Sequence, residues 1–244
     1  MPVQYQPFNT SQDVTTTKTL LHEVIPITGS VVSGTYGTFP NDDNIKNYSH
    51  GMFQSVYDYP YLSSSANHIF DLTVGYDETS ALSASTNTQN TKKINLYNQY
   101  AQVLLGYTGS TTDGVRKFEK DLALDGSGQM KEVVFINFSR LITKDQIKKG
   151  SFSLSLGTSS TFAAPFADDR LILSDYSATE RSGYAGGTPG GDYGILYTSS
   201  VGIGTGSGVG NVFYQAGIAV VTASVFGTAQ MNSGTETING VLTG

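Results

Sequence analysis

The hydrophobic residues of this chain come in short runs separated by Gly, Ser, Thr and Asn, and this limits what it can fold into. A run such as Ile218–Val221 is far too short to span a bilayer, so we expect no membrane insertion. Val133–Phe138 has the length and β-branching of a buried strand. Between residues 151 and 156 Leu or Phe alternates strictly with Ser, which predicts a strand with one buried and one solvated face. The remaining strands are predicted around Leu20–Ile27, Ile69–Val74, Leu171–Leu173, Gly194–Tyr197 and Val212–Val221.

Two short helices are predicted, near residues 92–105 and 144–149. In the first, Ile94, Tyr97, Ala101 and Leu104 recur at spacings of three and four, and Gly106 follows as a left-handed end residue. In the second, Thr143 and Gln146 form a capping box, Ile142 and Ile147 a hydrophobic staple, and Gly150 a stop.

The fold class that follows is mainly β or α+β, with antiparallel sheets in a sandwich-like arrangement. The 244 residues contain 28 Gly and only 14% charged residues, against about 25% in an ordinary soluble domain. We expect a flexible N-terminal arm over residues 1–20 and one β-rich domain over 21–244. Within that domain, sub-lobes at 21–130 and 131–244 are an open alternative.

Charge and residue usage exclude several classes of protein. The net charge is −6 and no basic cluster exceeds two residues, so we expect no nucleic-acid partner. The chain has no Cys, which removes disulfides and thiol chemistry. Its first residues lack the basic start and apolar run of a signal peptide, so we expect synthesis in a cytoplasm without Sec-type secretion.

Motifs that carry catalysis or metal binding are not found. His22, His50 and His68 lack the spacing of a zinc site. His68 and Asp71 are three residues apart, and a regular strand would place them on opposite faces. The pairs at 42–43 and 168–169 are adjacent carboxylates, which suit turns better than the two sides of a glycosidic bond. We therefore expect no enzyme activity, no cofactor and no metal.

Aromatic residues are concentrated between residues 48 and 61. As exposed side chains they would serve as interface anchors or as platforms for sugars. As buried side chains they would fill the core of a protein without Trp, and the general burial ranking of aromatics favours this second interpretation. The candidate interface residues here are Tyr48, Phe53, Tyr57, Tyr59 and Tyr61.

The N-terminal arm contains separate anchors in an otherwise polar segment. Tyr5, Phe8 and Val14 are spaced along it, but the arm buries too little apolar surface to offset its own ordering cost. We expect it to be mobile in the isolated chain and to become ordered across a neighbouring subunit.

One stretch resembles a known family. Residues 35–42, with the sequence TYGTFPND, and residues 47–61, NYSHGMFQSVYDYPY, are similar to virion structural proteins of contractile-tailed marine cyanophages. Residues 94–105, 135–150 and 214–218 match in kind. The resemblance implies a structural component of the bacteriophage tail or baseplate, assembled in the host cytoplasm, with other virion proteins as partners. It also implies that the natural polypeptide is longer, and it supplies no catalytic or binding residues.

Three functions remain open at this point. The first is a non-enzymatic building block that packs symmetrically, as a homo-oligomer, in the particle. The second is a receptor-binding module of the tail that uses the aromatic residues on a host surface glycan. The third, with the least support, is a tail-associated hydrolase of the cell envelope.

Overall fold

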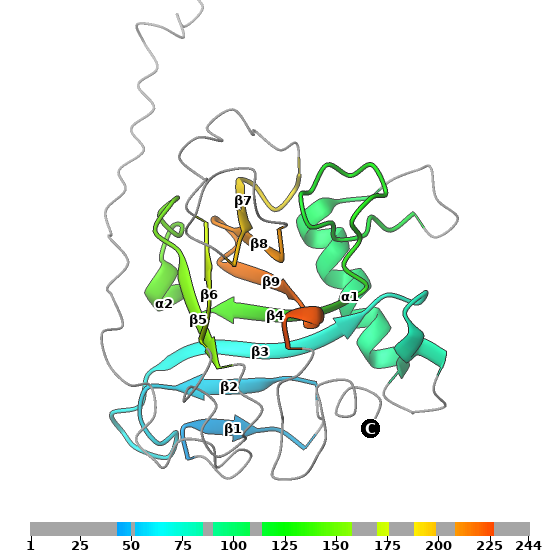
Figure 1. Cartoon of the computed structure of the whole chain (residues 1–244). Helices are drawn as coiled ribbons and strands as arrows, with labels where there is room; N and C mark the ends of the chain where they lie inside the picture. Colours follow the sequence, from blue (N-terminus) through cyan, green and yellow to red (C-terminus); the bar gives the residue numbers. More distant parts are fainter. Residues whose placement is uncertain are drawn as a thin grey trace, which may run out of the picture.

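The computed structural model describes residues 43–49, 52–84, 90–107, 114–157, 170–175, 188–198 and 208–226. These residues form nine strands, two α-helices and two 3-10 helices (Figure 1). The predicted strands near Leu20–Ile27, the N-terminal arm, Tyr5 and Phe8 lie outside the described residues. The strands are β1 (Ile45–Asn47), β2 (Gln54–Tyr57), β3 (His68–Tyr76), β4 (Glu132–Phe138), β5 (Ser153–Gly157), β6 (Arg170–Ser174), β7 (Tyr193–Leu196), β8 (Gly210–Phe213) and β9 (Ile218–Thr222), and the helices are η1 (Ala81–Ala84), α1 (Asn90–Leu105), α2 (Arg140–Thr143) and η3 (Ala223–Phe226).

Seven strands form one antiparallel sheet in the order β1-β2-β3-β4-β9-β8-β7, and β5 pairs with β6 in a second sheet. The predicted fold class, β-rich α+β with antiparallel sheets, is confirmed. The two sheets meet at a bridge between Ser174 and Tyr197, where each backbone N–H donates to the other residue's carbonyl. Residue 130 is the boundary between the two sub-lobes considered from the sequence. β3 precedes this boundary and β4 follows it, and the two strands pair over seven residues in the centre of the large sheet.

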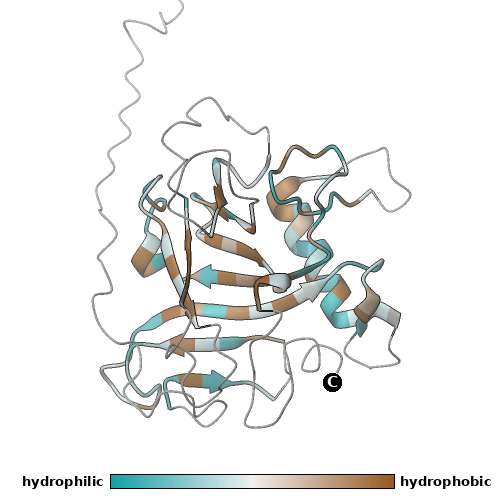
Figure 2. Cartoon of the chain, in the orientation of Figure 1, coloured by the Kyte–Doolittle hydropathy of each residue, from teal (hydrophilic) through white to brown (hydrophobic). Residues whose placement is uncertain are grey.

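The large sheet has a hydrophobic core on each face. On one face α1 lies over β3, and the core there joins Tyr97, Ala101 and Leu104 of the helix to residues of β4, β8 and β9. On the other face β5 and β6 run across β3 and β4, as Figure 1 shows. Figure 2 shows the hydrophobic residues gathered in β4, β8 and β9, whereas β1 is largely polar.

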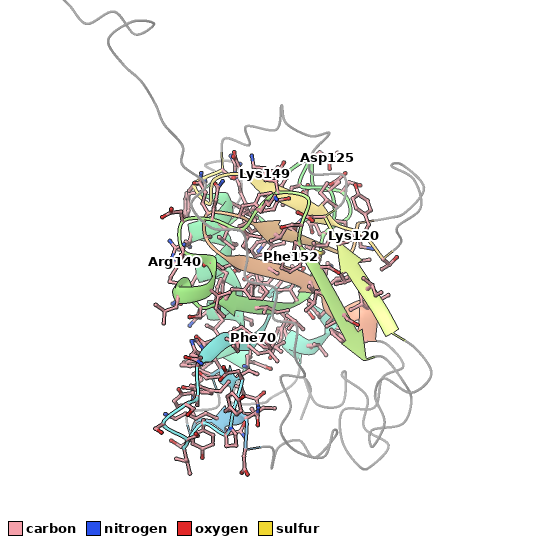
Figure 3. All side chains as sticks on the ribbon, turned by 90° about the vertical axis from the view of Figure 1, so that its left-hand side faces the viewer. Phe70, Lys120, Asp125, Arg140, Lys149 and Phe152 are labelled. Carbon is pink, nitrogen blue, oxygen red and sulfur yellow. The ribbon has the colours of Figure 1, made fainter. Side chains whose placement is uncertain are left out.

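Aromatic rings connect the second core to the small sheet. Phe138 on β4 contacts Phe70 on β3 with ring centroids 6.2 Å apart, and Phe152, next to β5, at 5.6 Å. Figure 3 labels Phe70 and Phe152, the two ends of this row. The strict alternation read from the sequence explains the contact, because Leu154 and Leu156 face the same core while Ser153 and Ser155 are exposed.

The first predicted helix is confirmed as α1. Gly106 follows it with a φ of +83°, and its N–H donates to the Gln102 carbonyl. Gly75 lets this helix approach β3 closely. A Cβ at Gly75 would lie 2.9 Å from the Phe135 ring and 3.1 Å from the Tyr97 backbone nitrogen. The helix therefore sits on the sheet at a distance that only Gly permits at this position.

The second predicted helix, at residues 144–149, is wrong. The helix α2 lies earlier, at Arg140–Thr143, and Ser139 caps it by accepting from the Leu141 N–H. The predicted cap, Thr143, instead donates its hydroxyl hydrogen to the Ser139 carbonyl. Lys144 then takes a φ of +46°, which ends the helix. The Ile147 N–H donates to the Tyr214 carbonyl, so the segment after α2 is held by tertiary contacts.

The single strand predicted at Val212–Val221 is also wrong, because it is a hairpin. β8 and β9 pair with each other, and the chain turns through residues 214–217. Gly217 adopts a φ of +68° at this turn, and its N–H donates to the Phe213 carbonyl. Tyr214 and Ala216 made the segment look continuous in hydropathy, although Gly217 carried the turn signal.

Candidate functional site

The predicted aromatic residues lie at the β1–β2 end of the large sheet. None of them belongs to either hydrophobic core, so the interpretation that they fill the core is wrong. Tyr48 and Tyr57 are half-buried, while Phe53, Tyr59 and Tyr61 are exposed. Tyr48 packs on Phe53 with ring centroids 4.9 Å apart, and Tyr57 lies 6.3 Å from Tyr61. These two pairs lie toward opposite ends of β2.

His68 and Asp71 lie on the same face of β3, and the prediction that they face apart is wrong. Val56 pairs with Phe70, but the next residue of β2, Tyr57, pairs with His68, so Ile69 is an extra residue on β3. Such a bulge shifts the alternation of side chains by one position. The His68 Nε2 therefore reaches Asp71 Oδ1 at 2.8 Å, and the His68 ring lies 5.5 Å from that of Tyr57.

Asp71 is the centre of a polar network on this face. Its Oδ1 also accepts a hydrogen bond of 2.5 Å from the Ser55 hydroxyl on β2. Because the Ser55 hydrogen is directed to Asp71, the Tyr48 hydroxyl 3.3 Å away donates to the Ser55 oxygen. The network thus connects the residue after β1 with β2 and β3 through side chains.

A pocket of about 170 Å³ adjoins this network. Asp71 and Thr73 of β3, Asn137 of β4 and two residues of α1 line it, together with Met52 and Phe53 before β2; the two helix residues are Leu96 and Tyr100. The Thr73 hydroxyl donates to the Met52 carbonyl, which holds the segment before β2 against β3.

Tyr100 forms a rigid wall of the pocket. Its ring stacks on Phe135 with centroids 4.0 Å apart and an interplanar angle of 13°. Its hydroxyl accepts a 2.5 Å hydrogen bond from Asn137 Nδ2. Burial raises the pKa of Tyr100, and the nearby Asp71 charge adds to this, while the hydrogen bond with Asn137 opposes it. The phenol is therefore neutral at physiological pH and keeps its own hydrogen as a donor.

Sequence reasoning placed Tyr48, Phe53 and Tyr57 beside this site but missed the polar residues at its centre. Asp71 lies between Phe70 and Leu72 and Asn137 between Ile136 and Phe138, and the two polar residues are paired in the β3–β4 register. A polar residue within a buried strand was the available signal, because burial without a partner is costly. Tyr100 was hidden within the apolar periodicity of α1.

The arrangement of Ser55, Asp71 and His68 differs from that of a nucleophile triad. In a triad the His lies between the nucleophile and the acid, so that it can remove the hydroxyl proton. Here the carboxylate lies between the other two, and both contact its Oδ1. Ser55 donates to the Asp71 carboxylate and not to the His68 imidazole, so these three residues do not have the order of a nucleophile triad.

Other predicted features add little to the site. His22, His50 and the carboxylates at 42 and 168–169 lie outside the described residues. Within the described ranges, no group of three or more His, Cys, Asp or Glu side chains is placed to hold a metal ion. No helix in the described part of the chain is long and apolar enough to cross a membrane.

The fold and the site define a β-rich α+β protein with a pocket of mixed polar and apolar lining between an aromatic segment and a helix. Comparisons with protein-family models, with curated proteins and with solved structures found no match.

Proposed function

We propose that this chain is a non-enzymatic structural component of a tailed-phage particle, packing against neighbouring subunits in the tail or baseplate. The resemblance of residues 35–42 and 47–61 to cyanophage virion proteins motivates the proposal. The structural observation that carries it is an exposed apolar surface between β2 and β3, the tip patch, formed by Tyr59, Tyr61 and Leu62. Their exposed fractions are 54%, 36% and 86%.

The tip patch is held rigidly, as an interface anchor should be. Asn67 donates to both carboxylate oxygens of Asp58, from its backbone N–H at 2.6 Å and from Nδ2 at 2.8 Å. The Asp58 N–H in turn donates to the Asn67 carbonyl. Slight burial works to raise the pKa of Asp58, but these hydrogen bonds outweigh it and lower the pKa below its ordinary value. The loop is therefore closed at its base before any partner binds.

Tyrosines on such a loop suit protein contacts. They supply large amphipathic area with few rotatable bonds, and they are enriched among residues that dominate interface energies. A weakly charged surface with an exposed Leu beside two Tyr favours a partner that covers the patch permanently. The partner is another virion protein or a second copy of this chain in a symmetric oligomer.

Purified particles provide the direct test. Mass spectrometry should find the chain in the virion, and a cryo-microscopy map should show Leu62 and Tyr59 covered by a neighbouring subunit. Leu62→Ser with Tyr59→Ser should reduce incorporation while the isolated protein keeps its melting temperature. Leu141→Ser, at a position on α2 that is 83% exposed, is the matched control. Absence of the chain from particles, or a solvent-facing tip patch in the map, would refute the proposal.

A second candidate function is a receptor-binding module of the tail that recognises a host surface glycan. The specific observation in its favour is the pocket between β3, β4 and α1, which combines polar atoms with aromatic walls.

A further inference from the structure

The pocket between β3, β4 and α1 contains hydrogen-bonding capacity that the described part of the protein does not use. Asp71 Oδ1 contacts both the Ser55 hydroxyl and the His68 ring, while its Oδ2 has no partner among the described residues. Asn137 donates to Tyr100, but its Oδ1 accepts from none of the described residues. The Tyr100 hydroxyl accepts from Asn137 and keeps its own hydrogen to donate.

These groups fit hydroxyl groups better than other ligand chemistries. Two acceptors and one donor are available at adjacent positions, and a hydroxyl can satisfy either kind because it both donates and accepts. Asp71 and Asn137 are directly opposite in the β3–β4 register, which places neighbouring side chains about 5 Å apart on one face. Two hydroxyls on adjacent carbon atoms can therefore be bound by the pair together.

The pocket is lined by both apolar and polar side chains. Phe53, Leu96 and Tyr100 line it beside Asp71 and Asn137. A sugar ring has the same division, since its C–H groups form an apolar face and its hydroxyls project from the edge. The electron-rich face of an aromatic ring attracts such C–H groups. The volume of about 170 Å³ lies below the roughly 300 Å³ of a pocket for a drug-sized ligand, so it suits one ring.

The charge of the pocket selects against acidic sugars. Asp71 supplies a carboxylate at its floor, and the neighbouring His68 already contacts that carboxylate. Among the described residues no Lys or Arg lines the pocket, and Lys93 donates from Nζ to the Met52 carbonyl oxygen at 3.4 Å. An anionic sugar would have to place its charge against Asp71.

We propose that this pocket binds a single neutral pyranose ring of a surface glycan, with Asp71 and Asn137 holding two adjacent hydroxyls and Tyr100 with Phe53 packing on the ring. The inference rests on the second candidate function above. It names the ligand class and adds Asp71, Asn137 and Tyr100 to Phe53, one of the aromatic residues at 48–61 that the sequence indicated for glycan binding.

The test uses the full chain and defined sugars. A glycan array containing neutral and acidic oligosaccharides identifies the preferred terminal sugar, and saturation-transfer NMR with the free neutral monosaccharide measures its affinity. Asp71→Asn and Tyr100→Phe each remove one hydrogen-bonding function of the pocket. Each should weaken binding by about tenfold or more, as expected for loss of a hydrogen bond in a ligand site. Tyr59→Ala, outside the pocket, should bind as the unaltered chain does.

Tyr100→Phe keeps the stack on Phe135, so it remains informative if Asp71→Asn lowers the melting temperature. The proposal is overturned if the chain binds no neutral sugar, if it prefers acidic sugars, or if Tyr100→Phe binds with unchanged affinity. Loss of binding in Tyr59→Ala with retention in Tyr100→Phe would place the glycan on the tip patch and also overturn it. A chain found in particles without sugar binding would refute this inference alone and leave the structural role standing.

Discussion

Asp175, at the end of β6, is a buried carboxylate on which three parts of the fold converge. It is 1% exposed. Its Oδ2 accepts from the Gly150 N–H at 2.8 Å and from the Tyr214 hydroxyl at 2.9 Å, and its Oδ1 accepts from the Phe152 N–H at 2.9 Å. The side chain thus holds the segment before β5, the end of β6 and the β8–β9 hairpin together. Asp175→Asn is the sharpest test of this role.

The loss of stability expected for Asp175→Asn follows from the three groups that donate hydrogen bonds to Asp175. An Asn amide can keep its oxygen at the position of Oδ2 and so retain the bonds from Gly150 and Tyr214. Its NH₂ group then faces the Phe152 N–H, and two donors meet in a buried site. One unsatisfied buried donor costs about 1–3 kcal/mol. In a chain of this size each kcal/mol lowers Tm by about 2–4 °C. Asp175→Ala should cost more, because it leaves all three donors without an acceptor.

The pH dependence has a definite sign. Burial raises the pKa of Asp175, although the hydrogen bonds from Tyr214, Gly150 and Phe152 act in the opposite direction. A group whose pKa is higher in the folded than in the unfolded state stabilises the fold most when it is protonated in both states. That contribution is present below the ordinary value of 3.8 and is lost as the pH rises through the raised folded pKa. Asn cannot titrate, so the advantage of Asp175 over Asn should shrink as the pH rises.

Urea unfolding of both proteins near pH 3.8 and at neutral pH measures this difference directly. Asp145→Asn, at an exposed position after α2, is the control and should leave the free energy of unfolding unchanged at both pH values. Equal stability of Asp175→Asn and the unaltered chain would contradict the role of Asp175 in holding the three segments together. A stability difference that grows with rising pH would show that the sign of the pKa shift is wrong.

Three further predictions concern other parts of the chain. Lys117→Met removes the 2.5 Å ion pair of buried Asp77 and should cost about 3–5 kcal/mol at neutral pH in urea unfolding. Burial works to raise the pKa of Asp77, but its bonds to Lys117 and Thr79 lower it overall, so this loss should fade as the pH falls below 3.8. Gly75→Ala should destabilise the fold by about 1–3 kcal/mol in thermal melting, because its Cβ would meet the Phe135 ring. Deleting residues 2–18 should leave Tm of the isolated protein unchanged and impair assembly; an equal loss of both would mean that the arm packs into its own domain.

The sequence predicted the elements whose pattern is local. β4, the alternation through β5 and helix α1 followed from periodicity, because burial of one face imposes a period of two on strands and 3.6 on helices. The helix at 144–149 failed for one local and one non-local reason. Its cap and staple were present in the sequence, but Thr143 bonds back to Ser139 and the Ile147 N–H bonds to Tyr214 of a distant hairpin. The tertiary hydrogen bond of Ile147 takes the place of one that a local helix would have made.

The candidate site depends on features that one-dimensional patterns do not carry. Asp71 and Asn137 become partners only through the β3–β4 register, and Tyr100 joins them only because Gly75 allows α1 close to β3. Ile69 has the largest consequence, since as an extra residue in β3 it moves His68 onto the face of Asp71. An apolar residue in an apolar strand gives no sign that it is a bulge. The signal lies instead in the two polar residues, Asp71 and Asn137, which stand next to apolar residues in their strands and are half-buried. In this pocket the described partners satisfy only part of each side chain, and a ligand that supplies the rest would gain the hydrogen bonds that Asp71 Oδ2 and Asn137 Oδ1 lack.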